Sequence, residues 1–232
     1  MNQYQFLLFD IDDTLLDFRA TEQLSLKMLF EQEKLDLTPD IEQHYRMYNQ
    51  GLWRSFEEGK LGRTELLNTR FANFLKEYGK EVDGVLMEKS YRGFLEQGHH
   101  MIDGALDLIN RLAPDYELYV VTNGVSKTQD RRLRDAGLHP LFKNIFVSDD
   151  TGYQKPMKEF FDYVFARIPN FSRDKGLIIG DSLLADMMGG KQAGLDTCWV
   201  NPEMKPDNIG VNPTYEIRSL IELYPILEKG RG

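Results

Sequence analysis

The chain has 232 residues, of which 41% are hydrophobic and 28% are charged, and its formal net charge is −9. This length allows one large α/β domain, or one domain that carries a smaller inserted domain. The acidic balance argues against nucleic acid as the main partner, because nucleic-acid binders need clustered lysine and arginine. A small phosphorylated substrate stays open, since a bound metal ion can reverse the local electrostatic field.

Cys198 is the only cysteine of the chain. One thiol can form neither an internal disulfide nor a cysteine-based zinc site, and its apolar neighbours predict a buried position. The N-terminal residues lack the basic region that begins a signal peptide. No stretch reaches the roughly 18 apolar residues that a membrane helix needs. We therefore expect a cytoplasmic protein that has no membrane partner.

Five short apolar runs predict buried parallel strands, because each run is apolar and ends in polar residues. Helical patterns lie between the later runs, and this alternation predicts an α/β fold, a parallel sheet flanked by helices on both faces. The predicted strands are residues 4–9, 117–121, 144–147, 176–179 and 196–200. The predicted helices are residues 105–112, 125–136, 156–167 and 183–193.

One long segment interrupts this alternation of strands and helices. Its pattern is helical throughout, with turns that contain Gly or Pro. Some 80 helical residues exceed a normal crossover between strands, which usually holds one helix. We therefore interpret residues 18–98 as an inserted all-helical domain, and residues 1–17 with 99–232 as a Rossmann-like core. The predicted helices of the insertion are residues 21–33, 39–57, 63–78 and 82–96.

Polar side chains follow the predicted strands at the points where the strands end. In open parallel sheets ligands bind at the carboxyl ends of the strands, so these side chains should converge on one edge of the sheet. In chain order they are Asp10, Asp12, Thr122, Asn123, Lys155, Asp181 and Asp186.

The chemistry that this set of side chains can perform is limited. Several carboxylates and one lysine, without cysteine or histidine ligands, suit a hard, oxygen-binding ion such as Mg²⁺. A carboxylate can attack phosphorus and form an aspartyl-phosphate. A lysine and a threonine hydroxyl can bind the remaining phosphoryl oxygens. A second carboxylate can protonate the leaving oxygen and later activate a water molecule.

Each of these residues also has an ordinary structural explanation. Asp12 could belong to a turn, Asp181 and Ser182 could cap the helix that follows, and Lys155 could be a solvated charge before a helix. A calcium-binding loop that begins at Asp10 is excluded, because Leu15 stands where such a loop requires glycine. The coincidence of all these residues at strand ends favours the functional interpretation.

These residues give the sequence its resemblance to the haloacid dehalogenase-like hydrolase superfamily, whose four short motifs occur here in order. The resemblance covers nearly the whole chain. It implies that residues 18–98 are the family's helical cap, which closes over the site and sets specificity. The motif residues are Phe9 to Leu15, Val121 to Gly124, Lys155 with Pro156, and Gly180 to Ser182 followed by Asp186.

The resemblance implies which residues perform the chemistry. Asp10 would attack phosphorus and bind Mg²⁺, and Asp181 would be a further metal ligand. Asp12 would be the general acid/base and would offer its backbone carbonyl to the metal. Dehalogenase members lack a carboxylate two residues after the nucleophile, because their ester hydrolysis needs no leaving-group acid there. Asp12 therefore favours phosphoryl transfer.

The resemblance also implies the residues that hold the substrate's phosphoryl group. Thr122 and Lys155 would bind it, with Asn123 beside it. Asp186 would orient Lys155 or a metal-bound water.

Residues 148–156 and 180–186 resemble a subgroup of bacterial 5′-nucleotidases that prefer pyrimidine monophosphates. In the helical segment, Trp53 and Phe71 could stack on a base or could belong to the core of the bundle. We expect a small-molecule phosphate ester, a nucleotide, as the substrate. Another capped phosphatase or a phosphosugar mutase of the same fold is the second hypothesis. A degenerate member that only binds a ligand or a protein is the third.

Overall fold

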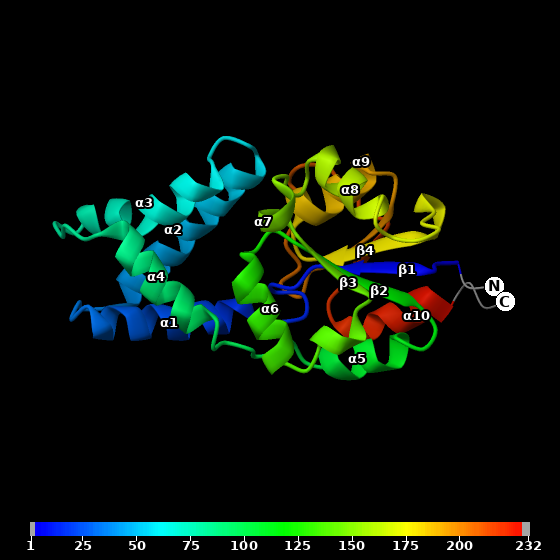
Figure 1. The fold of residues 1–232 in the computed structure, drawn as a ribbon, viewed down its shortest axis with the longest axis horizontal. Coiled ribbons are helices and arrows are strands. Elements are labelled where there is room, and N and C mark those ends of the chain that lie inside the picture. Colours follow the sequence, from blue (N-terminus) through cyan, green and yellow to red (C-terminus); the bar gives the residue numbers. More distant parts are fainter. Residues whose placement is uncertain (1–2, 229–232) are drawn as a thin grey trace. The chain divides into compact units, whose positions relative to one another are not determined.

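The computed structural model describes residues 3–228 of the chain. It divides into two compact units, with boundaries after Asp17 and after Gly98. We call Met1–Asp17 together with His99–Gly232 the core unit, and Phe18–Gly98 the helical unit (Figure 1). The roles of catalytic core and cap for these two units remain a prediction.

The described part of the core unit contains a six-stranded parallel sheet with the order β3-β2-β1-β4-β5-β6. The predicted Rossmann-like α/β fold is therefore confirmed. The last strand was not predicted, because it has three residues and only one of them is buried, which gives no apolar run. The strands are β1 (Phe6–Phe9), β2 (Glu117–Thr122), β3 (Asn144–Val147), β4 (Gly176–Gly180), β5 (Asp196–Val200) and β6 (Tyr215–Ile217).

Helices cover both faces of the sheet, which explains why strand side chains are buried on both sides. In β1, Leu7 and Phe9 belong to one apolar cluster, while Phe6 and Leu8 belong to another on the opposite face. The first cluster includes residues of α5 (Ala105–Leu112), α6 (Ser126–Asp135) and α10 (Leu223–Glu228). The second includes residues of α8 (Lys158–Phe165). The short helices are α7 (Ser148–Thr151) and α9 (Gly189–Gln192).

Strand β1 lies at the point where the order in which the chain adds strands reverses. The chain adds β2 and β3 on one side of β1 and then β4, β5 and β6 on the other. Phe9, the last residue of β1, pairs with Val120 of β2 and with Ile179 of β4. The residues that follow these three strands therefore meet at one edge, where open α/β sheets bind their ligands.

The helical unit consists of four helices within residues 18–98, all of which are described. Thr38 caps the second helix, because its side chain accepts a hydrogen bond from Ile41 N at 3.3 Å. Tyr45 stacks on Phe71 with ring centroids 5.3 Å apart, so aromatic rings form much of the core of this unit. The helices are α1 (Phe18–Gln32), α2 (Pro39–Glu57), α3 (Arg63–Lys76) and α4 (Gly84–Leu95).

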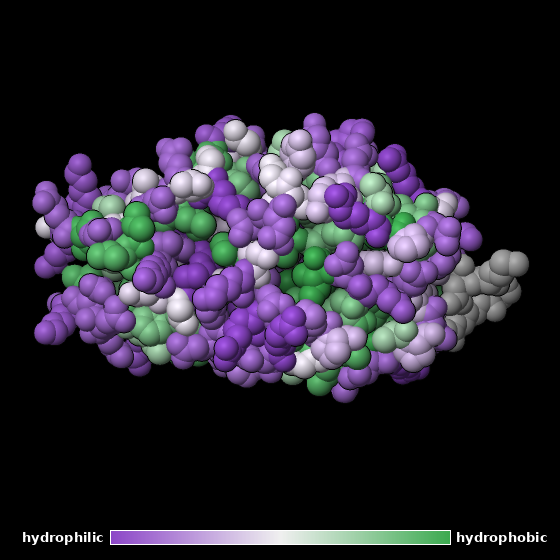
Figure 2. All heavy atoms as spheres, in the orientation of Figure 1, coloured by the Kyte–Doolittle hydropathy of each residue, from purple (hydrophilic) through white to green (hydrophobic). Residues whose placement is uncertain are grey.

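The molecular surface agrees with the polar composition of the chain. Figure 2 shows hydrophilic side chains over most of the visible face, with smaller hydrophobic areas between them. No helix among residues 3–228 is both long enough and apolar enough to cross a membrane. Cys198 is buried in the sheet, as its apolar neighbours predicted.

Candidate active site

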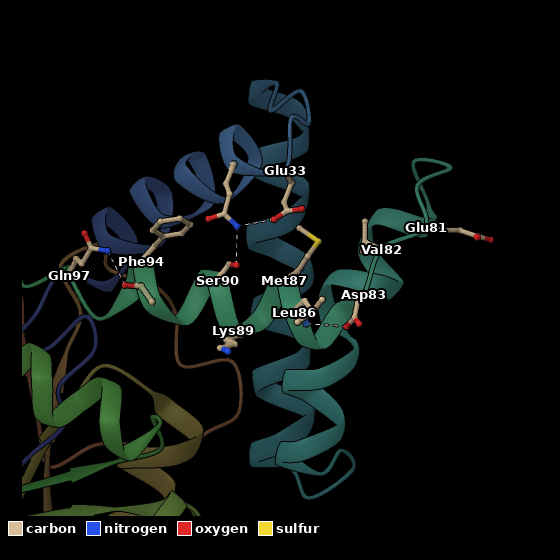
Figure 3. Close-up of a pocket in the computed structure, with 12 residues that line it drawn as sticks. Glu33, Glu81, Val82, Asp83, Leu86, Met87, Lys89, Ser90, Phe94 and Gln97 are labelled. Carbon is tan, nitrogen blue, oxygen red and sulfur yellow. Dashed lines mark hydrogen bonds between the residues drawn. The ribbon is translucent and has the colours of Figure 1, made fainter.

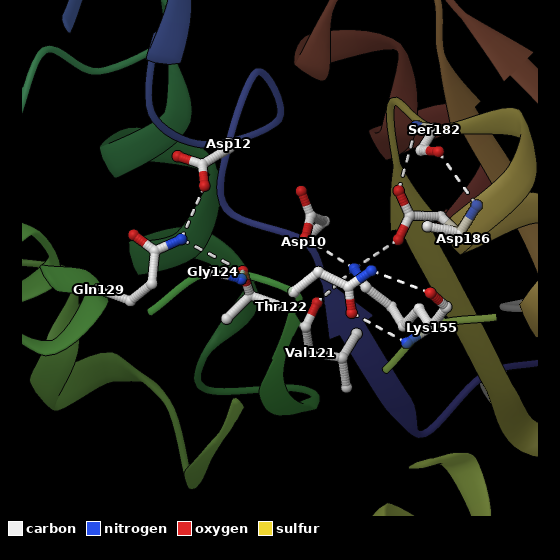
Figure 4. Close-up of polar contacts among 11 residues, drawn as sticks. Asp10, Asp12, Val121, Thr122, Gly124, Gln129, Lys155, Ser182 and Asp186 are labelled. Atoms are coloured by element: carbon white, nitrogen blue, oxygen red, sulfur yellow. Dashed lines mark hydrogen bonds and ion pairs between the residues drawn. The ribbon is translucent and has the colours of Figure 1, made fainter. Parts of the chain in front are cut away.

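Lys155 lies at the centre of the polar residues that follow the strands (Figure 4). Its Nζ donates hydrogen bonds to Asp10 Oδ1 at 2.7 Å, to Asp186 Oδ1 at 2.6 Å and to the Val121 carbonyl at 2.7 Å. The three acceptors use all three N–H donors of the ammonium group. With Lys155 only 1% exposed, the explanation of this residue as a solvated surface charge is wrong.

Asn123 fixes the backbone of Lys155. The side-chain Nδ2 of Asn123 donates to the Lys155 carbonyl at 2.9 Å, and its Oδ1 accepts from the Lys155 N–H at 2.9 Å. Both ends of the buried amide are therefore used to hold Lys155 in place. A direct contribution of Asn123 to phosphate binding remains a prediction.

The burial of Asp10 changes its affinity for a proton. Burial raises the pKa of Asp10 to about 7, and the nearby charges of Asp186 and Asp12 act in the same direction, while Lys155 opposes them. Burial lowers the pKa of Lys155, but the charges of Asp10 and Asp186 outweigh it and the pKa of Lys155 lies above its usual value. The ammonium group of Lys155 thus favours the ionised form of Asp10 against the effect of burial.

Three carboxylates of this site could hold a metal ion. One oxygen from each of Asp10, Asp181 and Asp186 lies within 4.8 Å of the other two. Three carboxylates and the single ammonium of Lys155 leave a net charge of −2 when all are ionised (−3 + 1). Clustered oxygen ligands with a surplus of negative charge fit a hard divalent cation. The Asp181 backbone carbonyl accepts a hydrogen bond from Trp199 Nε1 at 2.8 Å, which fixes this residue against β5.

The segment after β4 was predicted as one helix over residues 183–193, but it begins as a π-helical turn, η3 (Leu183–Met188), followed by α9. Ser182 caps this turn, since its Oγ accepts from Ala185 N at 3.0 Å. Asp186 Oδ2 accepts from Ser182 N at 3.1 Å, while its Oδ1 binds Lys155. The capping explanation therefore holds for Ser182, and the same turn also directs Asp186 to Lys155.

Asp12 is held by two residues of α6 that were not singled out in the sequence. Its Oδ1 accepts from Arg132 Nη1 at 2.5 Å, and its Oδ2 accepts from Gln129 Nε2 at 2.7 Å. Gln129 Nε2 also lies 3.2 Å from Thr122 Oγ1 (Figure 4). Both α6 residues are 1% exposed. The available signal was their spacing of three residues, which places them on one helix face.

Trp53 and Phe71 belong to the helical unit and differ in exposure. Phe71 is fully buried between Tyr45 and Tyr91, so it belongs to the core of the bundle, one of the two explanations left open by the sequence. Trp53 is half-buried and packs edge-on against Phe56 at a centroid distance of 5.7 Å. Contact between Trp53 and a substrate remains a prediction.

The helical unit also has a groove of about 780 Å³ between the end of α1 and α4 (Figure 3). Its lining is mixed, with Leu86, Met87 and Phe94 beside Glu33 and Lys89. No residue of the predicted site lines this groove. It therefore gives no independent indication of the chemistry.

A family model described as haloacid dehalogenase-like hydrolase matches residues 7–200, which is most of the chain and contains all four motifs. The chain belongs to this family. The haloacid dehalogenase-like (HAD) resemblance inferred from the motifs is thus confirmed, and the protein is a HAD-family hydrolase.

The relatives extend over nearly the full length. The HAD-hydrolase YfnB of Bacillus subtilis is 62% identical over 227 residues, covering 98% of this chain and 97% of the relative. A crystal structure of YfnB, described as bound to magnesium and as revealing interdomain movement, has a TM-score of 0.94 and covers 97% of this chain and 99% of that chain.

Two further relatives carry the name of an activity. The pyrimidine 5′-nucleotidase PynA of Streptococcus pneumoniae is 40% identical, covering 97% of this chain and 96% of the relative. The pyrimidine 5′-nucleotidase YjjG of Escherichia coli is 30% identical, covering 98% of this chain and 99% of the relative. This HAD hydrolase is therefore homologous to pyrimidine 5′-nucleotidases.

Proposed function

We propose that this HAD hydrolase is a Mg²⁺-dependent 5′-nucleotidase that hydrolyses pyrimidine nucleoside monophosphates through an aspartyl-phosphate on Asp10. The observation that carries the proposal is the second carboxylate, Asp12, two residues after the nucleophile and held by Arg132 and Gln129. Hydrolysis of a phosphate ester needs a proton for its leaving oxygen, and a fixed carboxylic acid can supply it.

In the first step, a carboxylate oxygen of Asp10 attacks phosphorus. The new O–P bond forms as the bond from phosphorus to the nucleoside oxygen breaks, and Asp12 gives its proton to that oxygen. In the second step, water attacks the phosphorus of the aspartyl-phosphate and Asp12 accepts its proton. The Asp10–phosphorus bond then breaks, which releases inorganic phosphate and restores both carboxyl groups.

Lys155 and Thr122 would hold the phosphoryl oxygens during both steps. Lys155 is already charged and in place, but its three N–H groups all have acceptors. To donate to a phosphoryl oxygen it would therefore exchange one of these acceptors when the substrate binds. Asp186 holds the ammonium group in position through its 2.6 Å contact. The hydroxyl of Thr122 lies at the end of β2 and is oriented by Gln129.

Mg²⁺ would be held by the carboxylates of Asp10 and Asp181 and by the backbone carbonyl of Asp12, with Asp186 close by. When bound, the ion neutralises the negative charge of the carboxylates and of the substrate phosphate. The clustering of three carboxylates supports this assignment, and so does the description of the YfnB crystal structure as bound to magnesium.

The helical unit would be the cap that selects the substrate, with Trp53 as a candidate contact for the base. The two nucleotidase relatives support a pyrimidine nucleotide as the substrate class. Other small phosphate esters remain the second hypothesis for the same chemistry.

Phosphate release from a panel of substrates tests this proposal. The panel contains CMP, UMP, AMP, GMP and several sugar phosphates, each with Mg²⁺ and with EDTA, and without any bisphosphate activator. We expect phosphate release that requires Mg²⁺ and is fastest with CMP or UMP. Faster release from a sugar phosphate would refute the nucleotide assignment. Full activity of the metal-stripped enzyme, or no release from any ester, would refute the proposed chemistry.

A further inference from the structure

Asp12 has a contact on each of its two carboxylate oxygens. Arg132 donates to Oδ1 at 2.5 Å and Gln129 donates to Oδ2 at 2.7 Å. A carboxylate has about four lone-pair positions, so these two bonds leave further positions on both oxygens. The carboxyl group is thus fixed in orientation, and its oxygens keep positions for a further contact.

The two donors are themselves locked together on α6. Arg132 Nη1 donates to Gln129 Oε1 at 3.0 Å, and Gln129 Nε2 is shared between Asp12 and Thr122 Oγ1. Gln129 therefore connects the acid/base residue to the hydroxyl that would bind the phosphoryl group. A change in its position would move both groups together.

Gly124 provides the space that Gln129 needs. A Cβ atom at position 124 would lie 2.4 Å from Gln129 Nε2 and 2.7 Å from its Cδ, distances that carbon atoms do not tolerate. The last residue of the second motif must therefore be glycine if Gln129 is to reach Asp12. The contact of Gln129 with Asp12 thus depends on the glycine of the second motif.

The burial of Arg132 shows that this arrangement has an energetic cost. Its side chain is 1% exposed, while the side chain of Asp12 is 30% exposed. A buried guanidinium loses its hydration and is tolerated only where it is paired and hydrogen-bonded. An exposed arginine could not hold Asp12 as rigidly, because surface ion pairs are weak and their side chains remain mobile.

We propose that Arg132 and Gln129 are positioning residues, which hold the carboxyl group of Asp12 in the orientation that delivers its proton to the leaving oxygen. This inference rests on the proposed function, in which Asp12 is the acid/base. During the first step the proton passes from Asp12 to the ester oxygen as its bond to phosphorus breaks. The carboxylate that results keeps its contacts with both donors, so it is in place to accept a proton from water in the second step.

The leaving group of the substrate provides a specific readout. p-Nitrophenolate departs without a proton, whereas the alkoxide of CMP needs one. The kcat/KM value reports only the steps up to departure of the leaving group, so it isolates proton donation. Both esters present the same phosphoryl group, so any change in phosphate binding through Thr122 cancels in the ratio of their kcat/KM values.

We expect Arg132→Met to lower kcat/KM for CMP by about a hundredfold and for p-nitrophenyl phosphate by less than about tenfold, since general acid catalysis contributes about 10²–10⁴. Gln129→Leu should lower the ratio of kcat/KM for CMP to kcat/KM for p-nitrophenyl phosphate as well. Arg132→Lys should lower this ratio less than Arg132→Met does. Arg134→Met is the matched control on α6, because Arg134 is 56% exposed and pairs with Asp130. It should leave both values unchanged.

Equal losses for the two esters in Arg132→Met and Gln129→Leu would overturn the inference, because a structural role lowers both rates alike. If Arg132→Met does not fold, Gln129→Leu and Arg132→Lys decide the question. Asp12→Asn separates the two proposals. If Asp12→Asn lowers both esters equally, the acid role of Asp12 itself fails. If Asp12→Asn shows the leaving-group effect and the α6 variants do not, only the positioning role fails.

Discussion

Replacing Lys155 with methionine should destabilise the core unit strongly. The ammonium group of Lys155 contacts Asp10 and Asp186 at 2.7 and 2.6 Å, and all three side chains are buried. Methionine fills similar space but leaves two buried carboxylates without a cation. Removing one partner of a buried ion pair costs about 3 to 5 kcal/mol. For a chain of this size that cost corresponds to a decrease in Tm of roughly 6 to 20 °C.

The effect of Lys155→Met should depend on pH through Asp10. Burial raises the pKa of Asp10 to about 7 in the folded protein, and Lys155 opposes that rise. A carboxyl with a raised folded pKa stabilises the fold when protonated, and this contribution is lost as the pH rises through the folded pKa. Without Lys155 the folded pKa of Asp10 moves further upward. The variant should therefore lose more stability, relative to wild type, at pH 8 than at pH 5.

Urea unfolding in EDTA at these two pH values measures both effects. Lys158→Met is the matched control, because Lys158 is 69% exposed and pairs on the surface with Asp162. It should cost less than about 1 kcal/mol at either pH. A loss of unfolding free energy in Lys155→Met that is as small as in Lys158→Met would refute the electrostatic account of the site. A loss that is the same at pH 5 and pH 8 would refute it as well.

Two further predictions concern the metal and the helical unit. Mg²⁺ at about 100 times its Kd should stabilise the wild type by about 2.7 kcal/mol, or roughly 5 to 10 °C in Tm measured by calorimetry. Asp181→Asn should reduce this shift in Tm severely. An unchanged shift in the variant would exclude Asp181 as a ligand. Trp53→Ala should change the ratio of kcat/KM between CMP and p-nitrophenyl phosphate, whereas Phe71→Leu should lower Tm and leave that ratio unchanged. A ratio that changes in Phe71→Leu and not in Trp53→Ala would refute the assignment of Trp53 as the substrate contact and Phe71 as a core residue.

Much of the core unit could be predicted from its sequence. Buried parallel strands are continuous apolar runs, and the residues after them converge for a geometric reason, so Asp10, Lys155 and Asp186 were predicted to meet and do meet. Strand β6 could not be predicted, because it is short and mostly unburied. Tertiary pairing with β5, not local sequence, makes it a strand.

The partners of Asp12 show a different limit. Gln129 and Arg132 lie in a helix rich in polar residues, where such side chains usually face water. Both side chains contact Asp12, which precedes Gln129 by 117 positions and Arg132 by 120 positions. No local pattern could therefore show that they are buried. For Phe71, helical periodicity identified an apolar face but could not say whether that face meets a ligand or other helices.

The nucleophilic role of Asp10 is the central claim, and acid-quenched mass spectrometry during turnover of CMP tests it most directly. The proposed mechanism predicts a peptide containing Asp10 that carries one additional phosphoryl group. It also predicts that Asp10→Asn, folded as judged by circular dichroism, shows neither this peptide nor phosphate release. Rapid phosphate release without a phosphorylated Asp10, or near-normal turnover by Asp10→Asn, would contradict it.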